Sequence, residues 1–117
     1  MQKLSLIALG RELLSKAVLS EEAGASSRAA RAAQTVHGGH EKALRQTVIA
    51  LGKDAALAEH ASPGEATVYV LHGRVSLASG GDSWEGRDGD LLLVPDAPHS
   101  LTALADSAVL LTVVKLP

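Results

Sequence analysis

Two stretches of this chain decide its fold. The first is residues 60–73, HASPGEATVYVLHG, and the second is residues 89–99, GDLLLVPDAPH. In the first stretch, positions 66, 68 and 70 are small or branched apolar residues, and polar or larger residues stand between them. This alternation is typical of a β-strand with one face toward a core. Gly73 allows a tight reversal after it, and Asp88-Gly89 forms a turn that leads into an apolar strand.

The rest of the chain from residue 34 onward continues this pattern. Short runs rich in Val, Leu and Thr are separated by turns that contain Gly and Pro. Many short strands, with no helical pattern between them, predict an antiparallel sandwich or barrel and argue against a parallel α/β architecture. The predicted strands are residues 33–37, 42–51, 55–60, 66–72, 74–79, 83–85, 91–94, 99–104 and 108–115.

A helical pattern precedes the strands. Ser5 is the predicted N-cap of an amphipathic helix of about 14 residues. Its basic and acidic residues balance, so we expect it to pack on its own domain or on a second copy. Residues 1–29 are therefore assigned to the helix and a linker, and residues 30–117 to a β-barrel, within one domain. The apolar positions of the helix are Leu6, Leu9, Leu13, Leu14, Ala17 and Val18.

Composition limits the function classes. A length of 117 residues suits one domain. The absence of cysteine excludes thiolate metal sites and disulfides, and it fits a cytoplasmic location. Tyr69 and Trp84 are the only aromatic residues and the net charge is -2, so a nucleic-acid partner is not expected. The apolar run near the N-terminus is too short to span a membrane, so no membrane partner is expected either.

The two stretches resemble the two conserved motifs of the cupin superfamily, whose members are small antiparallel β-barrels. Gly73, Gly89 and Pro95 fall at motif positions, and the 15 residues between the two glycines match the short spacer of minimal bacterial cupins. The resemblance covers about residues 34–115. It implies a mainly β fold, a small jelly-roll-like cupin barrel with one N-terminal α-helix.

The resemblance also implies a site. Cupins with three His and one Glu hold a divalent metal in the barrel, and these positions correspond to His60, Ser62, His99 and Ala66 in this chain. His99 arrives one residue earlier than in the family motif. His60 and His99 are thus an incomplete metal set, which would take iron, manganese, nickel or zinc, and no cofactor is assured. The implied ligand pocket comprises His60, Ser62, Ala66, Val68 and His99.

The ligand count departs from the family. Zinc needs at least three protein ligands, and non-heme iron needs two His and a carboxylate. Glu65 lies next to the lost Glu position, but alternation points it to the opposite face unless a bulge shifts the register. His72 is expected at the end of the barrel, and His37 and His40 in a polar hairpin. Asp82, Glu85, Asp88 and Asp90 are expected to form a solvated acidic hairpin.

Three function classes stay open. The leading interpretation is a small-molecule-binding or regulatory cupin with a degenerate metal site and no assigned catalytic residue. The second is a metal-dependent enzyme of dioxygenase or isomerase type that uses His60 and His99. The third is a structural or interaction module. A homodimer is expected, because Tyr69 and Leu71 face away from the proposed interior and need cover.

Overall fold

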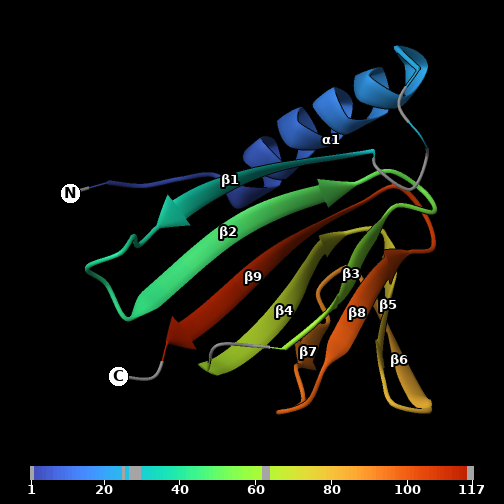
Figure 1. Cartoon of the computed structure of the whole chain (residues 1–117). Coiled ribbons are helices and arrows are strands. Elements are labelled where there is room, and N and C mark those ends of the chain that lie inside the picture. Colours follow the sequence, from blue (N-terminus) through green and yellow to red (C-terminus); the bar gives the residue numbers. More distant parts are fainter. Residues whose placement is uncertain (1, 25, 27–29, 62–63, 116–117) are drawn as a thin grey trace.

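The computed structural model of the chain describes residues 2–24, 26, 30–61 and 64–115. Within these residues one helix is followed by nine strands, in two antiparallel sheets (Figure 1). This confirms the predicted mainly β fold with one N-terminal helix, and each predicted strand is present with ends shifted by a few residues. The elements are α1 (Leu6–Glu22), β1 (Arg31–His37), β2 (Leu44–Leu51), β3 (Ala56–His60), β4 (Gly64–His72), β5 (Arg74–Ser79), β6 (Asp82–Arg87), β7 (Leu91–Leu93), β8 (His99–Ala103) and β9 (Ser107–Lys115).

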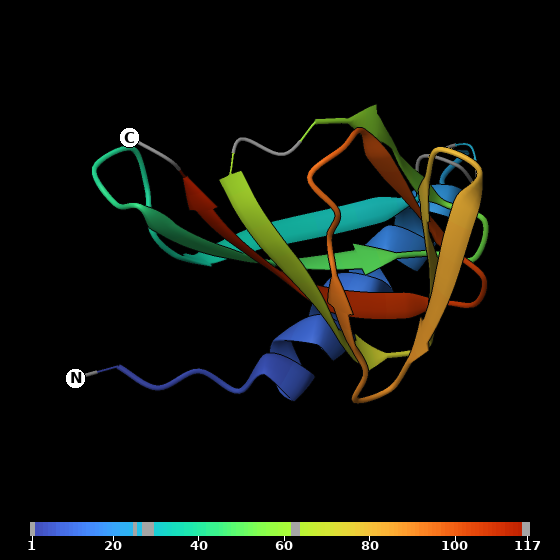
Figure 2. The ribbon, with the colours of Figure 1, turned by 90° about the horizontal axis from the view of Figure 1, so that it is seen from below.

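The two sheets interleave strands from different parts of the chain. One sheet has the order β1-β2-β9-β4-β7, and the other has the order β3-β8-β5-β6. The final strand, β9, lies between β2 and β4 and is antiparallel to both. Figure 2 shows the two sheets facing each other, with α1 on the outer side of the five-stranded sheet. The space between the sheets is the interior of the barrel.

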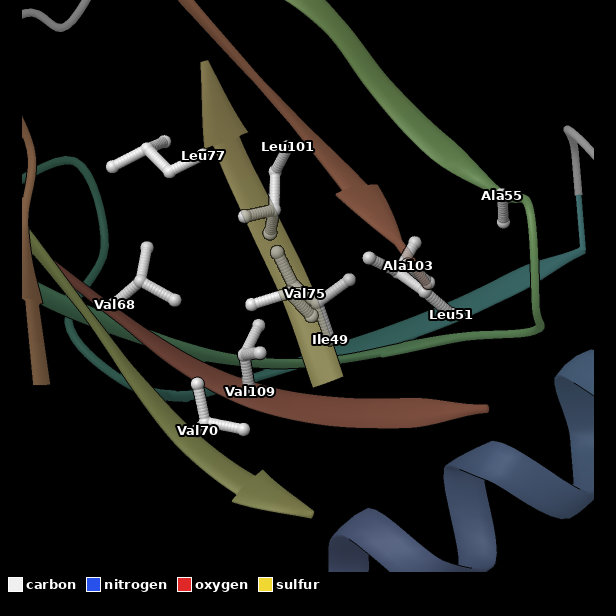
Figure 3. Packing of buried hydrophobic residues seen from close by; sticks show 10 residues of the cluster. All are labelled: Ile49, Leu51, Ala55, Val68, Val70, Val75, Leu77, Leu101, Ala103 and Val109. Atoms are coloured by element: carbon white, nitrogen blue, oxygen red, sulfur yellow. The ribbon is translucent and has the colours of Figure 1, made fainter. Parts of the chain in front are cut away.

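Aliphatic side chains fill this interior (Figure 3). Val68 and Val70 point into it, whereas Tyr69 between them is exposed on the outer face, as the alternation in the sequence predicts. The scarcity of large aromatic residues suits a narrow space between two strongly curved sheets. The buried cluster consists of Ile49, Leu51, Ala55, Val68, Val70, Val75, Leu77, Leu101, Ala103 and Val109.

Helix α1 has clear start and stop signals. The Ser5 side chain accepts a hydrogen bond from the Ala8 backbone N–H at 3.2 Å, which confirms the predicted N-cap. The helix continues to Glu22, three residues beyond the predicted region, because its stop signal comes later. Gly24 has a φ of 106° and its N–H donates to the Glu21 carbonyl, as in a glycine-terminated helix end. No helix within the described ranges is long and apolar enough to cross a membrane.

The apolar face of α1 covers part of the outer face of the five-stranded sheet. Leu13 is only 4% exposed and lies in a second cluster with Val48, Ala50, Leu71 and Ala108. The helix approaches β9 closely at Gly10, where an added Cβ atom would lie 3.1 Å from the Cβ of Ala108. The helix therefore packs on its own domain and supplies the cover that Leu71 was expected to need.

Part of the same outer face is left uncovered. Tyr69 pairs with Leu91 across β4 and β7, and Leu93 lies two residues further along β7. These three side chains are 38%, 56% and 73% exposed, respectively. We call them the β4–β7 apolar patch. It is the side of the sheet for which the sequence predicted a second subunit.

The packing of α1 predicts unequal effects of two leucine truncations. Leu13→Ala should lower the free energy of unfolding by about 2 to 4 kcal/mol, because it leaves a cavity between helix and sheet. Leu19→Ala is the control, since Leu19 is on the same helix but 61% exposed, and it should cost under about 0.5 kcal/mol. Urea unfolding measures both, and equal losses would contradict the helix placement.

Candidate functional site

His99 is held inside the barrel at the beginning of β8. Its side chain is 6% exposed, and it shares the inward face of the strand with Leu101 and Ala103. The imidazole Nδ1 lies 2.9 Å from the Ala97 carbonyl oxygen. A carbonyl oxygen only accepts, so Nδ1 carries the proton in this bond. The preceding loop is tied down as well, because the Ser79 hydroxyl donates to the Pro98 carbonyl at 2.8 Å.

His60 ends β3, opposite His99 in the register of the two strands. Its Nδ1 lies 2.8 Å from the Ala58 carbonyl oxygen, so this ring too carries its proton on Nδ1. His60 is exposed, whereas His99 is buried. The pair therefore spans from the rim of the barrel into its interior.

A β-bulge turns His60 toward the interior. Leu57 pairs with Leu101 and His60 pairs with His99, so Ala58 and Glu59 together oppose the single residue Ser100. Under strict alternation, Glu59 would share the inward face of Leu57 and His60 would point outward. The extra residue reverses this for the end of the strand. Glu59 is exposed as a result, and His60 lies on the inner face.

The two imidazoles form one contact. Their ring centroids are 4.7 Å apart and the planes are tilted by 58°. In the tautomer in which both Nδ1 atoms donate to backbone carbonyls, each Nε2 atom has a lone pair that accepts a hydrogen bond or binds a metal. The site thus presents two nitrogen acceptors in a fixed orientation.

A small cavity of about 60 Å³ lies beside the pair. This space has room for a few water molecules or for a small ligand group. Apart from the two imidazoles, every described residue that lines it is aliphatic. The lining residues are Ile49, Leu57, His60, Val68, Leu77, Val94, His99, Leu101, Val109 and Leu111.

The structure brings some of the predicted pocket residues together but not all. His60, Val68 and His99 line the cavity. Ala66 is on the same face of β4 as Val68, opposite Val113, but lies outside the cavity lining. Ser62 falls outside the described residues. Within the described ranges, no group of three His, Asp or Glu side chains is arranged to hold a metal ion.

Glu65 does not replace the missing carboxylate. The pairing of β4 with β9 is regular from Gly64 to Val70, so no bulge occurs near Glu65. Its side chain is exposed on the outer face. The register irregularity in β4 lies between Val70 and His72, too far along the strand to change the direction of Glu65.

Two acidic residues near the turn after β6 accept hydrogen bonds from the backbone. The Asp88 carboxylate accepts from the Gly73 N–H at 2.6 Å, and the Asp90 carboxylate accepts from the Arg87 N–H at 2.8 Å. His72 ends β4, on the outer face beside α1. Its Nδ1 lies 3.7 Å from Asp88 Oδ2. Asp88 is in the turn after β6, and Asp82 and Glu85 are exposed on β6, so the predicted solvated acidic hairpin is present, whereas His72 is the last residue of β4 and not a turn residue.

Apart from Val68, the aliphatic wall of the cavity was not identified from the sequence. Leu57, Leu77 and Leu111 come from three strands far apart in the chain. Each lies on the inward face of its strand, and the alternation of apolar and polar residues along the strand could have shown this. Which inward faces meet at one point depends on how the strands pair, and this register is not visible in the sequence.

The arrangement of strands matches known structures. A cupin superfamily protein from Desulfitobacterium hafniense superposes with a TM-score of 0.68 at 11% identity, over 74% of this chain and 78% of that chain. The chain folds as a cupin. This confirms the resemblance of the two sequence stretches to the cupin motifs, and it makes the cavity beside His60 and His99 the interior of a cupin barrel.

Other solved structures share this cupin fold. A conserved protein of unknown function from Streptococcus pyogenes has a TM-score of 0.68 and 28% identity, over 74% of this chain and 75% of that chain. A salicylate 1,2-dioxygenase from Pseudaminobacter salicylatoxidans has a TM-score of 0.72 and 21% identity, over 91% of this chain but 33% of that chain. No protein-family model and no curated protein sequence matches the chain.

The different burial of the two imidazoles predicts different costs of removal. His99→Ala should destabilise the protein by about 2 kcal/mol, because it empties a buried, hydrogen-bonded position. His60→Ala should cost about 0.5 kcal/mol, since this side chain is exposed. Thermal unfolding of the two variants side by side tests the assignment, which a larger loss for His60→Ala would contradict.

Proposed function

We propose that this cupin binds a small organic ligand in its barrel, with His60 and His99 as the recognition groups and without a bound metal. The observation that supports the proposal is the pair of oriented imidazoles beside an otherwise aliphatic cavity. Polar groups next to an apolar cavity are costly without a partner, and a ligand that donates hydrogen bonds supplies one.

The cavity limits the size of the ligand. A volume of about 60 Å³ is well below the roughly 300 to 1,000 Å³ of most drug-sized sites. It accommodates a compact molecule of a few heavy atoms with a hydroxyl or amino donor. The aliphatic wall favours a ligand with a small hydrocarbon portion, oriented so that its donor reaches Nε2 of either ring.

The donor set does not fit a metal of the kind that the cupin resemblance implies. Two imidazole Nε2 atoms are one ligand short of a zinc site, and they lack the carboxylate of a two-His iron site. Ala66, at the family's Glu position, has no donor atom. The proposal therefore assigns the two rings to direct ligand binding.

One observation favours a second candidate, a metal-dependent enzyme of dioxygenase or isomerase type. Metal-binding histidines usually donate their other ring N–H to a carbonyl or carboxylate, which fixes the ring orientation. Both His60 and His99 do so. The fold shared with the salicylate 1,2-dioxygenase is compatible with this candidate, so metal content is measured alongside ligand binding.

Blocking the cavity tests the ligand-binding proposal. Small alcohols, diols and amines of up to about five heavy atoms are screened by following the ring resonances of His60 and His99 by NMR. Val68→Leu should abolish the shifts, because it fills the cavity while keeping both imidazoles. Val114→Leu makes the same change on the exposed outer face and should leave binding intact. Ligand shifts that survive Val68→Leu, or no binder at all, would contradict the proposal.

Metal analysis separates the two candidates. Protein purified without chelator should contain iron, manganese, nickel and zinc at well below one ion per chain, and added zinc should raise the melting temperature by less than about 2 °C. The reason is the missing third ligand. Stoichiometric metal that is lost in both His60→Ala and His99→Ala would overturn the proposal and establish the metalloenzyme candidate.

Restoring the family's ligands tests the assigned register. Ser62→His combined with Ala66→Glu should create a tight metal site with His60 and His99, seen as at least a tenfold gain in zinc affinity. Ser62→His combined with Thr67→Glu is the control, because Thr67 is on the outer face of β4. If both double variants bind zinc alike, the inward position of residue 66 is wrong.

We also propose that the β4–β7 apolar patch, Tyr69, Leu91 and Leu93, forms a homodimer interface. The patch continues the sheet face that α1 already covers, since Leu110 under the helix pairs directly with Tyr69. Light scattering should give about 24 kDa, twice the 12.0 kDa of one chain. Leu93→Lys should shift this mass to that of a monomer, whereas the control Leu19→Lys should not. A mass near 12 kDa for the unaltered chain would contradict the interface.

A further inference from the structure

A second concave region lies on the other side of the five-stranded sheet, where the first half of α1 meets the end of β4. Figure 2 shows these two segments next to each other, away from the barrel interior. The groove between them has a volume of about 380 Å³, within the range of small-molecule sites. It is lined by Ile7, Gly10, Arg11, Leu14, Leu71, His72, Asp88 and Ala108.

The floor of the groove is apolar, and it is part of the buried cluster between α1 and the five-stranded sheet. Leu71 and Ala108 are buried, and Leu14 packs against the same cluster. Gly10 allows α1 to lie close to β9, since even one added carbon would crowd Ala108. Ile7, 54% exposed, adds a further apolar side chain. The floor therefore suits a branched aliphatic group.

The three remaining lining residues are a cation, an imidazole and an anion: Arg11, His72 and Asp88. Arg11 comes from α1, and among the described residues its guanidinium forms no ion pair. Asp88 comes from the turn after β6, and its Oδ1 already accepts from the Gly73 N–H. Its Oδ2 lies 3.7 Å from His72 Nδ1, which is longer than a hydrogen bond. Arg11 is therefore open to a ligand, and Asp88 Oδ2, in a long and exposed ion pair with His72, can still accept a hydrogen bond from one.

We infer that this groove is a second binding site, for a small zwitterion with an aliphatic side chain, chemically an α-amino acid such as leucine. The ligand carboxylate binds the Arg11 guanidinium, which matches a carboxylate in geometry. The ligand ammonium binds Asp88 Oδ2. The aliphatic side chain covers Leu14 and Leu71 on the floor. Charge complementarity favours this class, because a zwitterion contacts both Arg11 and the exposed His72–Asp88 pair. An anion alone would not use Asp88, and a cation alone would not use Arg11.

The site is independent of the barrel cavity. The groove uses the outward face of the sheet and the helix, whereas His60 and His99 are on the inward side. The inference therefore goes beyond the proposed barrel function, and the failure of one does not affect the other. NMR distinguishes them, because leucine should shift the ring resonances of His72 and leave those of His99 unchanged.

Calorimetric titration of the full chain compares four probes. L-Leucine should bind, and three analogues should each bind at least about tenfold more weakly. The analogues are 4-methylpentanoate, which lacks the ammonium, 3-methylbutylamine, which lacks the carboxylate, and glycine, which lacks the aliphatic side chain. Equal affinity for 4-methylpentanoate, or no leucine binding up to about 10 mM, would overturn the inference.

Two variants locate the charges. Arg11→Gln and Asp88→Asn should each weaken leucine binding at least about tenfold. The amide side chain in Asp88→Asn keeps a carbonyl oxygen that accepts from the Gly73 N–H, so the turn is preserved. Lys16→Gln on the same helix and Asp82→Asn on β6 are matched controls outside the groove and should bind leucine normally. Unchanged affinity in Arg11→Gln and Asp88→Asn, with melting temperatures intact, would overturn the assignment.

Discussion

The pairing of β9 with both β2 and β4 is the constraint on which the rest of this structure depends. It joins the last strand of the chain to two earlier ones along nearly their whole length. Because side chains alternate along β9, Val109 and Leu111 face the barrel cavity while Ala108 and Leu110 lie under α1. A shift of the β9 register by one residue would exchange these two sets. Both the barrel interior and the sheet surface on which α1 packs would then be lost.

The same sheet separates two regions of different chemistry. On its inner side, two imidazoles with free Nε2 atoms stand beside a small aliphatic cavity, which suits a compact hydrogen-bond donor. On its outer side, a larger groove combines an apolar floor with Arg11, which forms no ion pair within the described part of the chain, and with the His72–Asp88 pair. The helix, which lies outside the stretch that resembles the cupin motifs, creates the second region by covering only part of the outer face. Elaboration of a shared fold at its surface is a common way to add a site without altering the core.

The sequence predicted most of the fold because the strand signals are local. Alternation, glycine and proline turns and the Ser5 cap act over a few residues, so nine strands and one helix could be placed with small errors at their ends. The helix was predicted too short because the acidic residues after Leu19 have no apolar stripe, and its end depends on Gly24. Motif spacing predicted His60 and His99 as site residues, and the structure brings the two rings together beside the cavity. The inward face of β4 followed from alternation.

Other features required the tertiary structure, since they depend on contacts between distant residues. The bulge opposite Ser100 that turns His60 inward exists only in the pairing of β3 with β8. The leucines around the cavity come from strands whose register no local pattern specifies, and the cavity size depends on how these side chains fill the barrel. Arg11 and Asp88 are separated by most of the chain, so their groove exists only because α1 packs beside β4. The sequence by itself thus determined the elements and their apolar faces, whereas the packing of those faces decided which side chains meet.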